Sequence, residues 1–386
     1  MRPAGQTLAL VGMSLRSLPQ RAGSSLVIVL SMACIVAVLL SMLSETEGLV
    51  RAYDSAADPA CVIVLSAQTP SEYGNGLTRD EVGTILDAPG IAMAPDGHPA
   101  ADAEVLFWIP PTDAYTIGSP ELRGIGREGL IIRPRLRMLS GRMFHAGRHE
   151  LMVGVRAERA FGLKPGDKMI LPDGEWPIVG VFADGGNIDE GELLTDADTV
   201  MSSSGINGFG SVLLRLDSPG AFLRFARWLT TNPTLLVTAE TQSHYAERTA
   251  DQAGAFFTKI AYVIATIMTL GALFGAVKIM NTSVAVRARE IATLRAVGFG
   301  SVAVAISVVL ETAILAVAGA TLGGVLAWLL FGGRLIRGIE SAYTASVSPS
   351  LFALGIAWAL SLALLGGLPP AVRAARLSVS KALLAG

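Results

Sequence analysis

The sequence has few of the residues that an ordinary soluble domain or a disulfide-bonded scaffold needs. Among 386 residues there are two cysteines, and only 16% of the residues are charged, whereas 51% are hydrophobic. Cys34 lies in a long apolar run and Cys61 in a polar region, so we expect no bond between them and stability that comes from a packed core. So apolar a composition excludes an ordinary soluble protein of this length.

Motifs for nucleotide hydrolysis and for nucleophilic catalysis are missing as well. The sequence contains no G-x-x-x-x-G-K-[ST] phosphate loop, the dipeptide Gly-Lys does not occur, and there is no G-x-S-x-G nucleophile elbow. We therefore expect a chain that does not hydrolyse ATP by itself and that holds neither a cofactor nor a metal of its own.

What the sequence does have is four apolar runs, each about as long as the roughly 20 residues that a helix needs to cross a bilayer. They predict membrane helices at residues 22–46, 256–280, 300–333 and 345–369. The first run is longer than the apolar part of a secretory signal and lacks a convincing cleavage site, which favours an uncleaved anchor. Apolar residues and arginines ahead of it predict an amphipathic helix over residues 1–21.

The distribution of charge predicts the orientation. Residues 1–21, 278–295 and 373–386 hold ten Lys or Arg and a single acid, so these segments should be cytoplasmic. Residues 45–258 contain 17 basic and 29 acidic residues, a net charge of −12, which favours the opposite side. Residues 334–344 then form a short outer loop.

The long insert predicts a mixed α and β domain over residues 47–255. The run CVIVLSA suits a buried strand, and LTRDEVGTILDAPGI has helical spacing with Thr78 as its N-cap. The segments ELMVGV, KMILP and WPIVGVF predict strands separated by turns, and SVLLRL, FLRFARWL and TLLVTAE predict strand, helix and strand. The fold class is therefore a membrane protein with four transmembrane α-helices and a large α+β extracytoplasmic domain between helices 1 and 2.

Two motifs in the insert resemble binding sites, and a plainer interpretation is favoured for each. Gly124, Gly126 and Gly129 have the spacing of a dinucleotide-binding turn, but the sequence predicts no strand before them. The acidic run DGGNIDEGELLTD lacks the alternation of a calcium loop, which favours a solvated acidic hairpin or loop.

A third stretch carries residues of the types that bind metals. His145, His149 and Glu150 fall in a predicted loop rather than on one face of a helix. A solvated loop is therefore favoured over a metal site.

The stretch VRAREIATLRAVGFG, residues 286–300, places strong positive charge between two apolar runs. Drawn as a helix, it gathers five residues on one arc: Arg287, Ile291, Leu294, Arg295 and Gly298. Arg289 and Thr293 point away from this arc. The face either fixes topology and binds lipid phosphates, or docks into a cytoplasmic partner through Ile291 and Leu294.

This stretch resembles the cytoplasmic signature of the MacB/FtsX-like ABC transporter permeases, approximately R-x-R-E-I-G-x-L-R-A-L-G, with Ala292 and Val297 as mild departures. The ending GGLPPAVRAARLSVSKALLAG is similar to the family's ending, with Pro369, Arg373, Arg376 and Leu377 as its motif. The segment from SGRMF to PIVGVF resembles the family's outer-domain pattern, and CVIVLS fits its first outer strand. These matches occur in the expected order along nearly the whole chain.

The resemblance implies a permease subunit of the bacterial inner membrane that works with a separate ATPase. Two ATPase copies, which bind ATP and Mg, would assemble with this permease and a second permease copy or a paralogue. Residues 281–299 would form the coupling helix, and a cytoplasmic C-terminal helix would follow over residues 370–386. The coupling residues would be Arg287, Arg289, Glu290, Ile291, Leu294, Arg295 and Gly298.

The resemblance also implies how the periplasmic domain is built and what it does. A porter-like part would comprise residues 52–117 and 211–245, with a β-rich subdomain inserted over residues 118–210. In this family, cytoplasmic work changes a periplasmic conformation, which is called mechanotransmission. Relatives serve export with an adaptor and an outer-membrane channel, lipoprotein release, or control of cell-wall hydrolases.

Small and charged residues within the predicted spans are further candidate sites. The GxxxG pairs Gly271/Gly275 and Gly319/Gly323 permit close helix packing within or between protomers, although glycine is generally enriched in membrane helices. Glu311 lies at the cytoplasmic border if its helix enters the lipid near Thr312, and deeper, in need of a partner, if the helix begins near Gly300. Relatives commonly carry Glu there, which implies a shared structural or coupling role.

Two other classes of function remain open from the sequence. One is a membrane-anchored sensor or binding module without an ATPase, and the other is a membrane enzyme with its site in the outer domain. Co-purification of an ATPase would separate the permease from the sensor. The lack of a convincing catalytic constellation argues against the enzyme.

Overall fold

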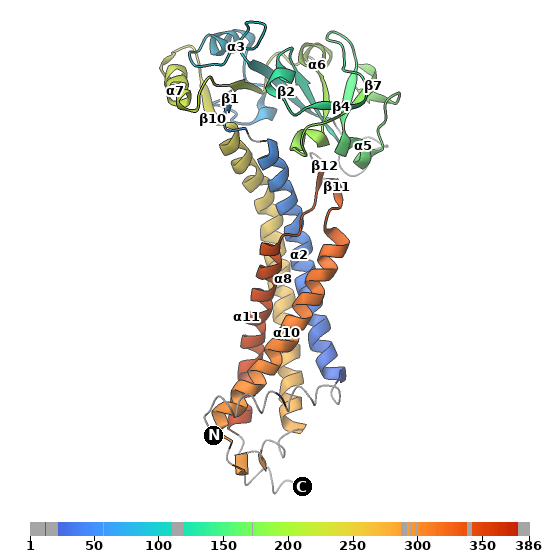
Figure 1. Cartoon of the computed structure of the whole chain (residues 1–386), viewed down its shortest axis with the longest axis vertical. Coiled ribbons are helices and arrows are strands. Elements are labelled where there is room, and N and C mark those ends of the chain that lie inside the picture. Colours follow the sequence, from blue (N-terminus) through green and yellow to red (C-terminus); the bar gives the residue numbers. More distant parts are fainter. Residues whose placement is uncertain are drawn as a thin grey trace. The chain divides into compact units, whose positions relative to one another are not determined.

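The structure is a computed structural model of the chain, shown in Figure 1. It describes residues 12, 22–56, 58–109, 119–171, 173–286, 292–293, 295–297, 299–337 and 342–376. The chain divides into two compact units. A membrane unit contains the long apolar helices, and an outer unit comprises Glu47–Gly254 and Leu335–Ala345.

Within the described residues, four helices are long and apolar enough to cross a membrane. They are α2 (Ala22–Ala56), α8 (Gln242–Val286), α10 (Ser301–Phe331) and α11 (Pro349–Ala375). The predicted fold class, with four apolar helices and a large domain after the first of them, is confirmed. Both α2 and α8 extend without a break beyond the predicted spans and into the residues of the outer unit.

The helix α11 does not end where the sequence analysis placed the boundary of the fourth span. It continues through Pro369 and Pro370 to Ala375. Each proline removes one backbone donor, and membrane helices tolerate this loss because neighbouring groups satisfy the freed carbonyls. Helices α10 and α11 lie side by side in Figure 1 and contact each other.

The outer unit is built on one mixed sheet with the strand order β10-β1-β9-β2-β3-β8-β5-β7-β4, and β6 pairs with β7. The strands are β1 (Cys61–Ser66), β2 (Ala101–Trp108), β3 (Glu121–Ile125), β4 (Arg137–Gly141), β5 (Leu151–Gly154), β6 (Lys168–Leu171), β7 (Gly174–Ala183), β8 (Leu193–Asp196), β9 (Ser211–Arg215) and β10 (Val237–Thr241). The pairs β3–β8 and β5–β7 are parallel, and the other pairs are antiparallel. The strands expected from CVIVLSA, ELMVGV, KMILP and WPIVGVF are all present.

Short helices cover this sheet (Figure 1). They are α3 (Arg79–Leu86), α4 (Gly129–Ile132), α5 (Val155–Phe161), α6 (Ala197–Ser204) and α7 (Phe222–Thr231), with the 3-10 turns η2 (Glu72–Gly74), η3 (Ile188–Gly191) and η4 (Pro219–Ala221). Two hydrophobic cores result, one around β1, β2, β9, α3 and α7 and the other around β3, β5, β6, β7 and β8. One sheet runs through both cores, and the β2–β3 pair joins the strands of the predicted porter-like part to those of the predicted inserted part.

The strand β1 shows why its apolar sequence is needed on both faces. Val62 and Val64 point into the first core, whereas Cys61, Ile63 and Leu65 pack on the opposite face with Tyr245 of α8. Since side chains alternate along a strand, a strand that is covered on both sides by apolar side chains favours apolar residues at successive positions.

Residues 334–344, predicted as a short outer loop, contain a β-hairpin of β11 (Leu335–Arg337) and β12 (Ala342–Thr344). The hairpin belongs to the outer unit, where Tyr343 packs with Leu49 of α2 and Ile188 of η3. The described strands of the connection between α10 and α11 are therefore part of the outer unit.

The start of α3 gives a direct test of a predicted cap. The hydroxyl of Thr78 accepts a hydrogen bond from the amide of Glu81, whose carboxylate in turn accepts one from the amide of Thr78, which completes a capping box. Thr78→Ala should cost about 1 kcal/mol and speed amide exchange in Arg79–Leu86 about fivefold.

Thr84→Ala is the matched control for this prediction, because the hydroxyl of Thr84 only donates to the carbonyl of Asp80 within the same helix. Equal acceleration of exchange in both variants would show that the capping box does not stabilise α3.

Candidate functional site

Most of the predicted coupling residues lie outside the described residues, as does Leu377 of the C-terminal motif. They are Arg287, Arg289, Glu290, Ile291, Leu294 and Gly298. Of the described neighbours, Ala292, Thr293 and Arg295 are helical, and the amide of Val297 donates to the carbonyl of Thr293 at 3.0 Å. The side chain of Val297 is exposed. The docking role of this stretch stays a prediction.

Gly319 and Gly323 of α10 lie against α2. A Cβ at Gly319 would come within 2.6 Å of the carbonyl oxygen of Val29, and a Cβ at Gly323 would overlap the backbone of Ala33. Both distances are too short for a side chain, so this glycine pair permits helix packing within one protomer.

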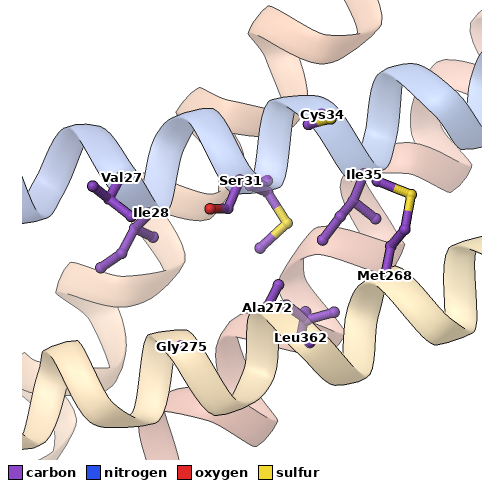
Figure 2. A pocket seen from close by; sticks show the side chains of 11 residues that line it. Val27, Ile28, Ser31, Cys34, Ile35, Met268, Ala272, Gly275 and Leu362 are labelled. Carbon is purple, nitrogen blue, oxygen red and sulfur yellow. The ribbon is translucent and has the colours of Figure 1, made fainter.

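Gly271 and Gly275 of α8 are placed differently. They border an apolar groove of about 440 Å³, shown in Figure 2, where the labelled side chains of α2, α8 and α11 surround an open space. Its lining residues include Ile28, Ser31, Ile35, Met268, Ala272 and Leu362. A Cβ on either glycine would meet nothing within 4 Å. Within the described residues, this glycine pair therefore makes no close helix contact.

The other predicted site residues of the membrane unit that the structure describes lie on α10 and near the end of α11. Because α10 begins at Ser301, Glu311 lies about 15 Å along the helix. Its depth in the membrane stays a prediction. Its side chain is buried. On α11, Pro369, Arg373 and Arg376 are exposed near the end of the helix.

The outer unit contains a cluster of buried charges that the sequence analysis missed. Arg123 of β3 is 5% exposed, and it binds three carboxylates. Its Nε and Nη2 atoms donate to Glu192 at 2.7 and 3.1 Å, while Nη1 donates to Glu72 at 2.7 Å and to Glu104 at 2.9 Å. The bidentate pair with Glu192 is the strongest geometry available to a guanidinium.

A second arginine completes the cluster from the end of α4. Arg133 donates from Nη1 and Nη2 to Glu104 at 2.7 and 2.9 Å and from Nε to Asp189 at 2.9 Å. Burial alone would raise the pKa of Glu104, but Arg133 and Arg123 together lower it below its usual range. Glu104 is therefore held as a carboxylate between two guanidinium groups.

These contacts correct the prediction for the acidic run DGGNIDEGELLTD. Asp184, Asp189, Glu190 and Glu192 are buried rather than solvated. Asp189 and Glu192 are neutralised by the two arginines, and Glu190 accepts hydrogen bonds from the amides of Asp184 and Gly186. The acids are enclosed because partners from β3 and α4, more than 50 residues earlier in the chain, lie beside them.

The buried cluster borders a small cavity of about 60 Å³ with tyrosine side chains in its wall. Tyr245 of α8 donates its hydroxyl to Glu72 at 3.1 Å, and Tyr73 donates to Glu121. Within the described residues, no group of three or more His, Cys, Asp or Glu is arranged to hold a metal. The cluster is thus an ion-pair network that joins η2, β2, β3, α4, η3 and α8.

The histidines considered as metal ligands lie apart from this cluster. The Nδ1 atom of His145 lies 3.0 Å from Glu150, which is also bound by Arg142. The ring of His149 stacks on Trp176 with 4.5 Å between ring centroids. Each histidine therefore has a local packing or ion-pair contact.

The glycines in RGIGREG serve packing, and the expectation that no strand precedes them is wrong. They follow or belong to β3, and a Cβ at Gly124 would lie 2.8 Å from the Cα of Ala197. Gly126 and Gly129 leave space for the carboxyl group of Asp102, which accepts a hydrogen bond from the amide of Gly126 at 2.9 Å. Burial, together with the charge of Glu104, raises the pKa of Asp102 to about 8.

Comparison with known families assigns the membrane helices. Residues 262–379 match the model of the family described as FtsX-like permease C-terminal. This part of the chain is therefore similar to FtsX-like permeases. Together with the four described helices that are long and apolar enough to cross a membrane, the match supports a multi-pass membrane protein.

Comparison with curated proteins finds no match. Among solved structures, the chain is similar to the extracellular domain of YknZ, a noncanonical ABC-type transporter from Gram-positive bacteria. The identity is 16%, the match covers 47% of this chain and 99% of that chain, and the TM-score is 0.36. This score is too low to establish a shared fold.

The raised pKa of Asp102 predicts how the stability of the outer unit depends on pH. Between the ordinary pKa of an Asp, about 4, and the folded value of about 8, the folded state holds a proton that the unfolded state releases. The free energy of unfolding of the outer unit should therefore fall as pH rises through this window. Asp102→Asn should remove that part of the slope and raise the melting temperature at pH 8 relative to wild type.

The matched control is Asp251→Asn, which makes the same change at an exposed residue of α8. Its melting temperatures from pH 5 to pH 8 should follow the wild-type profile. An Asp102→Asn variant with the same slope as the wild type would show that Asp102 does not titrate in this window.

The two glycine pairs of α8 and α10 predict opposite outcomes for the same substitution. Gly323→Leu should prevent the packing of α10 on α2, at a cost of several kcal/mol from overpacking, and reduce the yield of folded protein. Gly271→Leu should leave folding intact, because the groove has space for the side chain. Size-exclusion profiles and thermal unfolding in detergent measure both effects. Similar loss of folded protein in the two variants would contradict the difference in packing.

Proposed function

We propose that this FtsX-like permease is the transmembrane subunit of an ABC transporter in which a separate ATPase drives a conformational change of the outer unit. ATP and Mg bind in the partner ATPase, and the permease transmits the movement across the bacterial inner membrane. The outcome is export or extrusion of a substrate from the periplasm or the outer leaflet. The outer unit is then a periplasmic domain.

The single observation that carries this proposal is the unbroken helix α8. It runs from Gln242, next to the last strand of the outer sheet, to Val286, at the edge of the cationic cytoplasmic stretch. Its 45 residues span about 68 Å, well beyond the roughly 30 Å of a bilayer core. Because α8 is continuous, the proposal is that displacement at its cytoplasmic end is passed to its outer end.

The cytoplasmic stretch supplies a docking element for this movement. Its predicted face combines two apolar anchors, Ile291 and Leu294, with arginines that suit carboxylates on a partner. Arg295 is a described residue of this stretch, and it lies in a helical segment. A short helix between two membrane helices is a rigid place at which an ATPase can act.

A second permease copy is proposed to cover the groove beside Gly271 and Gly275. The groove is apolar, and neighbouring apolar side chains on the surface of α8 are exposed, among them Ile267, Leu270 and Phe274. Exposed glycines let a partner helix approach closely, whereas the other glycine pair is already occupied by α2. The assembly would then contain two permeases and two ATPases.

Substitutions on the docking face test the proposed function. Leu294→Asp should place an unpaired carboxylate in a desolvated contact and weaken binding of the ATPase by several kcal/mol. Arg295→Glu should also weaken binding, because it reverses a charge beside that anchor. The measurement is the amount of ATPase that co-purifies with each variant, together with transport-linked ATPase activity.

Arg289→Ala is the control, since Arg289 points away from the predicted docking face. It should retain most of the bound ATPase at matched membrane levels. Full ATPase binding by Leu294→Asp and its loss in Arg289→Ala would overturn the docking face, and the absence of any co-purifying ATPase from the wild type would overturn the proposed function.

A further inference from the structure

One short turn of the outer unit, η3, contacts segments that lead to three of the four membrane helices. Ile188 of η3 packs in a hydrophobic cluster with Leu49 and Ala52 of α2 and with Tyr343 of β12. The hairpin that contains Tyr343 joins α10 to α11. The apolar side of η3 therefore contacts α2 directly. It is connected to α10 and α11 through the hairpin that joins them.

The fourth membrane helix reaches η3 through the buried charges. Tyr245, in the first turn of α8, donates its hydroxyl to Oε2 of Glu72 at 3.1 Å. Oε1 of the same carboxylate accepts from Arg123 at 2.7 Å, and Arg123 holds Glu192 with two hydrogen bonds. Glu192 is the residue that ends η3. Hydrogen bonds thus connect Tyr245, at the start of α8, through Glu72 and Arg123 to Glu192, at the end of η3.

This connection has the features of a stiff link. Tyr245, Arg123 and Glu192 are all buried, so their polar contacts are poorly screened by water. The guanidinium is planar and is held by carboxylates on several sides, which leaves it little freedom to rotate. A shift of Glu72 therefore requires Arg123 and its other partners to move with it.

We propose that Glu72, Arg123, Glu192 and Ile188 form a coupling node, through which displacement of α8 is passed to η3 and from there to the α10–α11 hairpin. This inference rests on the proposed function, since it identifies the route by which movement spreads within the outer unit. Arg123 acts as a positioning residue, because it holds η3 relative to α8 through Glu192 and Glu72.

Amide hydrogen exchange of the full-length protein in detergent tests the node through Tyr245→Phe. This variant removes one hydroxyl and keeps the ring, over which the guanidinium of Arg248 lies at 5.2 Å. Exchange should become about two- to thirtyfold faster in residues 188–192 and 342–344, the range expected when a coupled site is perturbed. Tyr245 does not belong to the hydrophobic cluster that contains Ile188 and Tyr343. Faster exchange in these two segments would therefore not come from a lost hydrophobic contact with Tyr245.

Two controls separate coupling from simple loss of stability. Tyr262→Phe removes a hydroxyl from the same helix and should leave exchange in both segments unchanged. In Tyr245→Phe itself, exchange in β6 should also stay at the wild-type rate, because β6 lies in the other core of the sheet. Faster exchange confined to α8 and η2, or faster exchange throughout the outer unit, would overturn the node.

A double-mutant cycle with Glu192→Gln tests the route itself. The amide keeps the shape of the side chain but weakens its pairing with Arg123. In this background, Tyr245→Phe should no longer accelerate exchange in residues 342–344, whereas additive effects would overturn the route. The exchange measurement contains no ATPase, so its result is independent of ATPase binding. If no ATPase binds, the proposed function is disproved and the exchange result still stands. If ATPase binds but the exchange pattern is not the expected one, only the coupling node is disproved.

Discussion

The pairing of one buried guanidinium with three carboxylates is the constraint on which the outer unit depends. Arg123 lies in the middle of the sheet, on the strand where the two hydrophobic cores meet. An uncompensated charge at that depth would be strongly unfavourable, so Glu72, Glu104 and Glu192 must all reach it. Since these acids come from η2, β2 and the end of η3, their pairing defines how those elements are placed on the sheet.

Hydrophobic burial alone would not impose the same placement. Apolar cores tolerate repacking when volume and pattern are conserved, whereas hydrogen-bonded ion pairs are satisfied in a narrow range of geometry. The outer unit uses both: β1 is buried among apolar side chains on each face, and β2 and β3 carry charged side chains that pair with one another. The ion pairs therefore contribute specificity in a domain without a disulfide among its described residues.

The sequence predicts those features that depend on local patterns. Four apolar runs identify the membrane helices, the β-branched run at Cys61–Ser66 identifies a buried strand, and Thr78 identifies a helix start. The burial of Asp189 and Glu192 could not be predicted in this way, because their neutralising partners Arg133 and Arg123 are distant in the sequence. A signal was present, since the strand-forming segments ADAEVLFW and ELRGI carry charges at positions that a covered sheet would otherwise fill with apolar residues.

The same distinction applies to the glycines. A GxxxG spacing is identical in α8 and α10, yet only Gly319 and Gly323 are covered by a neighbouring helix, while Gly271 and Gly275 border an open groove. Spacing shows that a close approach is permitted, and only the packing of the other helices decides whether the partner belongs to the same chain. In α10 the partner is α2 of the same protomer. In α8 no described residue of another helix lies within 4 Å of a Cβ placed at Gly271 or Gly275, and the same continuous helix carries Tyr245. Under the proposed function, assembly of the membrane helices and movement of the outer unit would therefore depend on one element.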